Sequence, residues 1–270
     1  IPNSADFTNG QSTVNVIVYK ATYPNTLKLS CSHTGKSGES NAFVASPGPY
    51  AKLILILPGE IHEPGNIVAE GKSGTPWPYI VANPDRPTIE TTVYAVDEYW
   101  NRVNPLSQPV IHIDVENPAE HFINVEPGNP LGMIGGEVAF QTTLRTAATG
   151  QTLIATDMGN PDISGTSKID VYPGLVKKLQ IIAPGQTPVP GSDLGKIGAI
   201  QNQVAGVNFD LIVRVVDQYW NLVPSINLDR IELSSKGDRT LAGRCNPEVL
   251  VDGVTRFSIW LDGQNKDIDI

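Results

Sequence analysis

Two pairs of polar residues in this sequence have the types and the spacing to bind a cation. Asp97 is followed by Asn101, and Asp217 is followed by Asn221, with three residues between the members of each pair. Carboxylate and amide oxygens are the ligands that Ca²⁺ prefers, but a complete site needs about six to eight oxygens. The alternative is an Asx-type turn, in which the aspartate accepts hydrogen bonds from backbone N–H groups. One carboxylate per turn makes a poor cage, so the turn is favoured over calcium.

Further oxygen ligands would have to come from a neighbouring loop. Asp157, Asn160 and Asp162 are the candidates for that contribution. Calcium is therefore the one cofactor that the sequence suggests, and it stays the weaker of two interpretations.

The histidines do not add a metal-binding or catalytic pattern. His33, His62, His112 and His121 fall at unrelated positions of the repeat described below. His112 alternates with Asp114 and Glu116 along one strand face, a spacing that suits a surface metal site. Because the intervening residues are apolar and face the other way, a solvated strand face is the favoured interpretation.

Known catalytic motifs are missing from the sequence. It has no His-Glu-x-x-His, no Cys-x-x-Cys and no nucleophile elbow. The segment Gly71-Lys72-Ser73-Gly74 lacks the frame of a phosphate-binding loop. We therefore expect a protein that is not an enzyme.

Two aromatic residues, Trp77 and Tyr79, lie in a Pro-rich loop. Exposed rings of this kind can stack on sugar faces, which would make the loop a ligand-binding site for a surface glycan. Packing of the loop against a sheet is the commoner use of such residues. An adhesin or carbohydrate-binding module is thus the alternative function.

Composition narrows the classes of partner. The 270 residues carry a formal charge of −9 without a Lys/Arg cluster, so the electrostatic footprint of a nucleic-acid binder is missing. The longest apolar run, residues 53–57, is far shorter than the roughly 20 residues of a membrane span. Cys31 and Cys245 are too few for a disulfide scaffold, and we expect thiols unless they bridge neighbouring chains.

The chain is organised around a repeat. The segment Val96-Asp97-Glu98-Tyr99-Trp100-Asn101 returns as Val216-Asp217-Gln218-Tyr219-Trp220-Asn221. A long alignment without gaps also relates residues 10–65 to positions 126 further along, including Pro47-Gly48 and Pro173-Gly174. The repeat is about 120 residues long. Because Trp100 and Trp220 recur at the same strand end, we expect both to be structural.

Strand patterns fill each repeat. Alternation of apolar and polar residues predicts strands at 14–18, 26–31, 41–45, 51–57, 89–96, 110–115, 137–144, 152–156 and 168–171, with copies at 177–182 and 209–215. In the strand that enters the motif, Ile89, Thr91, Val93 and Ala95 share the inward face. About seven short strands per repeat, separated by turn signals, predict tandem immunoglobulin-like antiparallel β-sandwich domains in an all-β chain.

The repeat resembles the bacterial immunoglobulin-like repeats of large surface proteins, including the invasin/intimin group. The resemblance rests on the Asp-x-x-x-Asn turn, on Gly-Glu-Val-Ala-Phe at 136–140, and on Gly-Gln-Thr-Leu-Ile-Ala-Thr-Asp at 150–157. It covers nearly the whole chain at the level of motifs. The Pro-Gly segments and the Tyr-Trp pair depart from the commonest pattern, which leaves the subfamily open. The resemblance implies extracellular, tandem, non-enzymatic modules, and it carries over no catalytic residue.

The phase of the repeat predicts three parts. Residues 1–48 match the last strands of a unit, residues 49–174 form a complete immunoglobulin-like domain, and residues 175–270 begin another, without counterparts of the strands at 152–171. In one interpretation the sequence is a window cut from a longer array. In the other, residues 27–48 of one copy supply the missing strands to the last unit of another, by pairing at an open sheet edge.

These observations favour a non-catalytic structural segment of a bacterial surface protein or fibre. We expect an extracellular location at the cell surface, where the segment serves as a stalk or shaft. The expected partners are neighbouring immunoglobulin-like domains or further copies of the chain, through donor-strand or end-to-end assembly. Short Pro/Gly junctions at 46–49 and 172–174 would limit bending between units.

Overall fold

The regular elements that the structure describes are all β-strands. The computed structural model describes residues 6–21, 28–30, 35–224, 231–233, 241–243 and 248–261, and no helix occurs among them. The predicted all-β class with antiparallel immunoglobulin-like sandwiches is therefore confirmed. Within these described ranges, no helix is long and apolar enough to cross a membrane.

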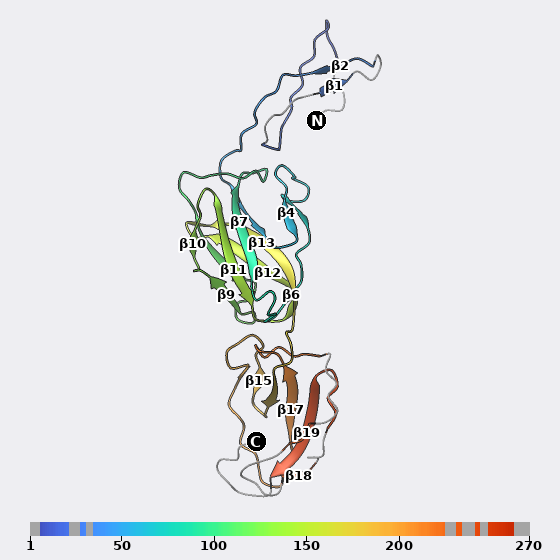
Figure 1. The fold of residues 1–270 in the computed structure, drawn as a ribbon, viewed down its shortest axis with the longest axis vertical. Coiled ribbons are helices and arrows are strands. Elements are labelled where there is room, and N and C mark those ends of the chain that lie inside the picture. Colours follow the sequence, from blue (N-terminus) through green and yellow to red (C-terminus); the bar gives the residue numbers. More distant parts are fainter. Residues whose placement is uncertain are drawn as a thin grey trace.

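Three parts follow one another along the long axis of the molecule (Figure 1). We call them the N-terminal segment (6–48), the central unit (49–174) and the C-terminal unit (175–261). The N-terminal segment contains β1 (Lys28–Ser30) and β2 (Ser37–Glu39). The central unit contains β3 (Lys52–Ile56), β4 (Glu60–His62), β5 (Lys72–Gly74), β6 (Tyr79–Ile80), β7 (Ile89–Val96), β8 (Val110–Val115), β9 (Ile123–Glu126), β10 (Leu131–Gly132), β11 (Glu137–Leu144), β12 (Ala148–Asp157) and β13 (Asn160–Tyr172). The C-terminal unit contains β14 (Lys178–Ile182), β15 (Thr187–Pro188), β16 (Lys196–Ile197), β17 (Phe209–Val216), β18 (Leu241–Gly243) and β19 (Val254–Leu261).

The central unit is a sandwich of two sheets. One sheet has the order β3-β7-β11-β9 and the other β10-β8-β12-β13-β6, and only the β13–β6 pair is parallel. The core lies between them, because alternate residues of each strand point inward. Ile89, Thr91, Val93 and Ala95 of β7 are all buried, as their spacing predicts. Leu53, Phe140 and Leu153 represent the other strands in this core.

The C-terminal unit repeats the first of these sheets. Its strand order is β14-β17-β19-β18, and Phe209, Leu211, Val213 and Val215 of β17 are buried. Ile231 forms an isolated bridge with Glu248, in the place where β8 pairs with β10 in the central unit. The described residues of this unit contain no pair of strands like β12 and β13.

The N-terminal segment departs from the predicted strands. Residues 12–21 form no strand, so the prediction for 14–18 was wrong, and at 41–45 only a single bridge position occurs. Val14 and Ile17 are exposed by 43% and 60%. The physical reason is the lack of a partner strand in the described part of this segment, whereas the matching strand of the central unit, β11, is held between β7 and β9. Within 26–31, residues 28–30 form β1 and the others lie outside the described residues.

Candidate functional site

The repeated Asp-x-x-x-Asn motif forms a closed corner at the end of β7 and again at the end of β17. Asp97 N donates to Asn101 O at 2.9 Å, and Asp217 N donates to Asn221 O at 3.0 Å. Trp100 and Trp220 both adopt a φ of 68°. This left-handed conformation is uncommon for a bulky residue, so other contacts must hold it in place.

The aspartate of each corner supplies those contacts. Asp97 Oδ1 accepts hydrogen bonds from the backbone N–H groups of Tyr99 (2.8 Å) and Asn101 (2.9 Å). Asp217 Oδ1 accepts the same two bonds from Tyr219 and Asn221, at 2.8 and 3.0 Å. Both aspartates are nearly fully buried. The corner is therefore an Asx-type turn, in which the carboxylate replaces water for backbone donors.

Hydrogen bonding sets the charge state of Asp97. Burial by itself would raise the pKa of this carboxyl, because it disfavours the charged form. Hydrogen bonds from Gly48 N, from the Asn101 side chain and from the Asn101 and Tyr99 N–H groups outweigh burial, so the pKa lies below its ordinary value. The group is thus held as a carboxylate.

The asparagine of each corner binds the part of the chain that precedes its unit. Asn221 Oδ1 accepts from Ala147 N at 2.8 Å, and Asn221 Nδ2 donates to Arg145 O at 2.8 Å. Residues 145–147 form the turn between β11 and β12 of the central unit. Asn101 does the same to the N-terminal segment, with Ala21 N (2.7 Å) and Tyr19 O (2.8 Å). Each asparagine is therefore a two-bond bridge between consecutive parts of the protein.

A linker glycine adds one more bond at each corner. Gly174 N donates to Asp217 Oδ2 at 2.9 Å, and Gly48 N donates to Asp97 Oδ2 at 2.8 Å. Because these glycines directly precede the two units, the aspartate fixes the connection itself. We call the corner of a unit, with the preceding residues and the linker glycine bound to it, a junction: junction 1 at Asp97 and Asn101, and junction 2 at Asp217 and Asn221.

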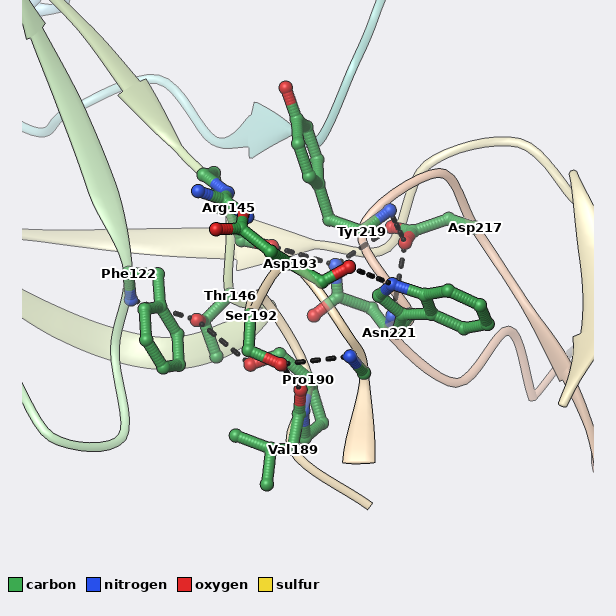
Figure 2. A network of polar contacts seen from close by, with 12 residues as sticks. Phe122, Arg145, Thr146, Val189, Pro190, Ser192, Asp193, Asp217, Tyr219 and Asn221 are labelled. Carbon is green, nitrogen blue, oxygen red and sulfur yellow. Dashed lines mark hydrogen bonds and ion pairs between the residues drawn. The ribbon is translucent and has the colours of Figure 1, made fainter. Parts of the chain in front are cut away.

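Side chains close junction 2 around these bonds (Figure 2). The Arg145 guanidinium lies over the Tyr219 ring, 4.9 Å from its centroid, and its Nη2 contacts Asp193 Oδ1 at 2.5 Å. Thr146 Oγ1 accepts from Phe122 N at 3.0 Å and donates to Pro190 O at 3.4 Å. Tyr219 also packs against the hydrophobic core of the central unit. One face of the C-terminal unit is therefore fitted to the end of the central unit.

Junction 1 uses other side chains in the same places. The rings of Tyr19 and Tyr99 meet edge to face, with centroids 5.1 Å apart. His62 Nε2 lies 2.8 Å from Trp100 O, and the imidazole stacks on Tyr94. Burial lowers the pKa of His62, and the positive charge of Arg102 lowers it further, although the bond to Trp100 O opposes both effects. The neutral imidazole is thus the form that supports this corner.

The two motif tryptophans have matching surroundings. Lys52 Nζ lies 4.7 Å from the Trp100 ring centroid, and Lys178 Nζ lies 3.3 Å from that of Trp220. Trp220 Nε1 also donates to Asp193 O at 3.2 Å. These contacts account for the recurrence of the tryptophans as parts of the corner.

The calcium prediction concerns the same four residues, and these contacts bear on how a cation would bind. Both oxygens of Asp97 and of Asp217 face N–H donors, which a cation would have to displace. No group of three or more potential metal ligands occurs among the described residues. Asp157 accepts from Tyr50 Oη and Gly159 N, outside both corners. Calcium binding stays a prediction.

The two aromatic residues predicted to bind a ligand differ in accessibility. Trp77 is 61% exposed, and the Arg86 guanidinium lies 5.8 Å from its ring centroid. Tyr79 has no exposed surface and donates its hydroxyl to Pro87 O at 2.6 Å, and burial raises its pKa to about 12. A ligand cannot stack on a buried ring, so the prediction is corrected for Tyr79, which is a core residue. Only Trp77 remains a candidate.

The structure leaves other sequence candidates outside the junctions. His112 and Asp114 are half-buried on the outer face of β8, while Ile111, Ile113 and Val115 point into the core. Cys31, Cys245 and His33 lie outside the described residues, so their predicted states are not addressed.

Sequence reasoning missed half of each junction. It singled out the corner and the Pro/Gly linkers, but not the residues bound by the asparagine: Tyr19 and Ala21 at junction 1, and Arg145 and Ala147 at junction 2. A signal was present, because these pairs of positions are each 126 residues apart, like the rest of the gap-free alignment. Nothing in it showed that they face the next unit.

Comparisons with known proteins give distant structural neighbours. No protein-family model matches the sequence, and no curated protein matches it. Among solved structures, the Escherichia coli adhesin FdeC is similar over 88% of this chain and 65% of its own, with 11% identity and a TM-score of 0.31. Domains 4–9 of the surface layer protein SbsC are similar over 90% of this chain and 32% of theirs, with 12% identity and a TM-score of 0.29. This chain thus spans less than two thirds of either neighbour.

Proposed function

We propose that this chain is a non-catalytic structural segment of an extracellular bacterial surface protein or fibre, in which tandem units form a stiff shaft. The observation that carries the proposal is the repeated junction. In both copies, a buried Asp/Asn corner binds a short stretch of the preceding part and its linker glycine through main-chain groups. Because the buried polar groups of the corner form hydrogen bonds with the neighbouring part of the chain, bending between units would break those bonds and is therefore limited.

The mechanical role follows from the kind of atoms that are bound. Backbone N–H and C=O groups are present whatever the side chains are, so one corner can receive different preceding units. The side chain that packs on the motif tyrosine varies, from Tyr19 on Tyr99 to Arg145 on Tyr219, and it fills the space around a constant set of bonds. This arrangement suits an array whose units diverge in sequence while they keep a common spacing.

Small-angle X-ray scattering tests the proposal directly. The wild-type chain should scatter as an extended particle of fixed maximum dimension. The double variant Asn101→Ala, Asn221→Ala should give a broader distribution of dimensions with both units folded. A Thr166→Ala variant is the control, because this exposed residue lies in the middle of β13, away from both ends of the central unit. Wild-type scattering typical of freely jointed units would contradict the proposal.

A second function, an adhesin or carbohydrate-binding module, is favoured by one feature. Trp77 is 61% exposed on a loop, with the Arg86 guanidinium beside its ring. A sugar face could stack on this ring. Binding to a glycan array that disappears with Trp77→Ala and persists with Ile80→Ala, a change at a neighbouring exposed residue, would support this function. Equal binding by both variants would exclude Trp77 as the site.

A further inference from the structure

The first and last strands of the central unit lie side by side and run in the same direction. They belong to different sheets, β3 to one and β13 to the other. Tyr50, just before β3, donates its hydroxyl to Asp157, which precedes β13, at 3.1 Å. Further along, a Cβ atom on Gly165 of β13 would lie 2.6 Å from Leu53 O of β3. Because both contacts advance in the same sense along the two strands, β3 and β13 are parallel.

Tension along the chain would act on these two strands. The polypeptide enters the central unit at Gly48, shortly before β3, and leaves it at Gly174, shortly after β13, and both glycines are bound at junctions. The N-terminal segment and the C-terminal unit lie at opposite ends of the central unit (Figure 1). A pull on both ends would therefore draw β3 and β13 past each other in opposite directions. Bonds between two such strands are loaded together, so the force divides among them.

Lys72 of β5 joins the backbones of the two strands. Its ammonium group donates to Leu55 O of β3 at 3.0 Å and to Thr166 O of β13 at 2.9 Å. A third bond, to Glu60 Oε1 at 3.1 Å, forms an ion pair in which the side chains of Lys72 and Glu60 are 21% and 8% exposed. Because a cation donates these bonds and water is largely excluded, they are stronger than hydrogen bonds between neutral groups.

Glu60 of β4 adds a second connection between the same strands. Its Oε2 accepts from Leu57 N, directly after β3, at 2.8 Å and from Ser167 Oγ of β13 at 2.9 Å. The two connections also bind each other through the ion pair. We call Lys72 and Glu60, with the groups that they bind next to β3 and β13, the latch.

The lysine of the latch recurs in the C-terminal unit. Lys196 also follows a glycine in a short strand, β16, and donates to Ile181 O and Gln186 Oε1. These acceptors stand 126 positions after the first two acceptors of Lys72, the carbonyl of β3 and the side chain at position 60. A lysine in this place is therefore part of the repeated structure, although the surrounding loops differ in sequence.

We propose that the latch makes the central unit resist tension along the chain, because it holds β3 and β13 against sliding past each other. The load passes from Gly48 into β3, across Lys72 and Glu60, and through β13 to Gly174. Strands such as β8 and β9 lie outside this path. This inference rests on the proposed function, because an array of connected units transmits tension through each of them. The junctions limit bending between units, and the latch limits extension within one.

Single-molecule force spectroscopy of the full chain, held at its two termini, tests this inference. The central unit is recognised by the length of chain that its unfolding releases. At a fixed force, Lys72→Met should unfold this unit about tenfold faster than the wild type, because methionine fills a similar space and donates no hydrogen bond. Lys168→Met is the matched control, because this exposed lysine of β13 takes no part in the latch and should be lost without effect.

A parallel measurement in denaturant separates a load-bearing role from a general loss of stability. Ile113→Val, in the buried face of β8, should speed unfolding in denaturant and leave the rate under force nearly unchanged. Lys72→Met should show its larger effect under force. Ser167→Ala removes only one bond of Glu60, so it should act in the same direction to a smaller extent and decides the matter if Lys72→Met does not fold.

Failure of this inference and failure of the proposed function give different results. Latch variants that unfold under force at the wild-type rate, or that respond to force and denaturant in the same proportion as Ile113→Val, would overturn the inference. The wild-type chain would still scatter as a rod in that case, because the latch lies within one unit. Freely jointed scattering, in contrast, would contradict the proposed function whatever the force needed to unfold a unit.

Discussion

The two junctions make the same main-chain bonds with different side chains. In both, aspartate caps the corner and asparagine bridges to the preceding part of the chain, and matching bonds differ by 0.1 Å or less. Around them, junction 1 places a tyrosine edge against Tyr99, whereas junction 2 places Arg145 over Tyr219 and adds an ion pair. The comparison teaches that the connection between units depends on main-chain hydrogen bonds that are the same in both junctions. The side-chain contacts around these bonds differ from one junction to the other.

The supports of the two junctions also differ. At junction 2 the bound turn belongs to a complete sandwich, and Tyr219 packs against its core. At junction 1 the bound residues lie in an extended segment in which residues 12–21 pair with no strand. Junction 2 is therefore the one in which two packed bodies are fixed relative to each other, and it should respond more strongly to changes in its corner.

The largest expected effect comes from removing a corner aspartate. Asp217→Ala leaves the N–H groups of Gly174, Tyr219 and Asn221 buried without acceptors, which should destabilise the C-terminal unit by about 3 kcal/mol or more. Hydrogen exchange followed by mass spectrometry measures the loss in each unit. Asp97→Ala should act on the central unit in the same way. An exchange rate unchanged at Tyr219 and Asn221 would contradict the capping role.

A smaller effect is expected when the bridging asparagine is removed. Asn221→Ala leaves Ala147 N and Arg145 O without their partners, at a cost of about 1–3 kcal/mol. Part of this cost is avoided if the units separate and water reaches these groups. The variant should therefore lose less than the full cost in stability and bend more at junction 2. Asn101→Ala should cost less, because the segment it binds is already largely exposed to water. Equal losses at both sites would remove the distinction between the junctions.

The side chains around the bonds should contribute least to stability, about 1 kcal/mol or less. Arg145→Ala removes the contact with the Tyr219 ring and the ion pair with Asp193, whose carboxylate is 87% exposed. Because salt screens an exposed pair, the effect of this variant should shrink at high ionic strength. Tyr19→Ala at junction 1 should show no such salt dependence. Denaturation at low and high salt compares the two.

Low pH should destabilise the central unit more than the C-terminal unit because of His62. The counterpart of His62 in the C-terminal unit is Pro188, which does not titrate. The folded-state pKa of His62 lies below its ordinary value near 6.5. The stability that favours the neutral ring is therefore present above about pH 6.5 and is lost as the pH falls through the folded pKa. Asp97, whose pKa is also lowered, adds a second loss below about pH 4. Thermal unfolding of wild type and His62→Gln against pH checks the first step, which the variant should lack.

Much of the fold could be predicted from the sequence because strand and corner are local patterns. The alternation in residues 89–95 and 209–215 placed both inward faces correctly, and the recurrence of Trp100 and Trp220 indicated a structural corner. The strand predicted at 14–18 failed for a non-local reason. Alternation shows that a segment could form a strand, but a strand needs a partner, and residues 12–21 pair with none of the strands that the structure describes.

The site was only half predictable for a related reason. An Asx turn is visible in the sequence because aspartate and asparagine are its own residues. The groups that it binds are backbone atoms of Tyr19, Ala21, Arg145 and Ala147. Almost every residue type has these backbone groups, so the sequence does not show which of them are bound. Tyr79 was misassigned because a loop aromatic and a core aromatic look alike until the burial of the ring is known.

The central claim is that the Asp/Asn corner fixes consecutive units relative to each other. ¹⁵N relaxation of the wild-type chain and of Asn221→Ala tests it most directly, because it reports the tumbling of each unit separately. We predict that the central and C-terminal units of the wild type tumble as one elongated body, and that the variant shows two faster, distinct correlation times. Independent tumbling in the wild type, or a variant that still tumbles as one body, would contradict the claim.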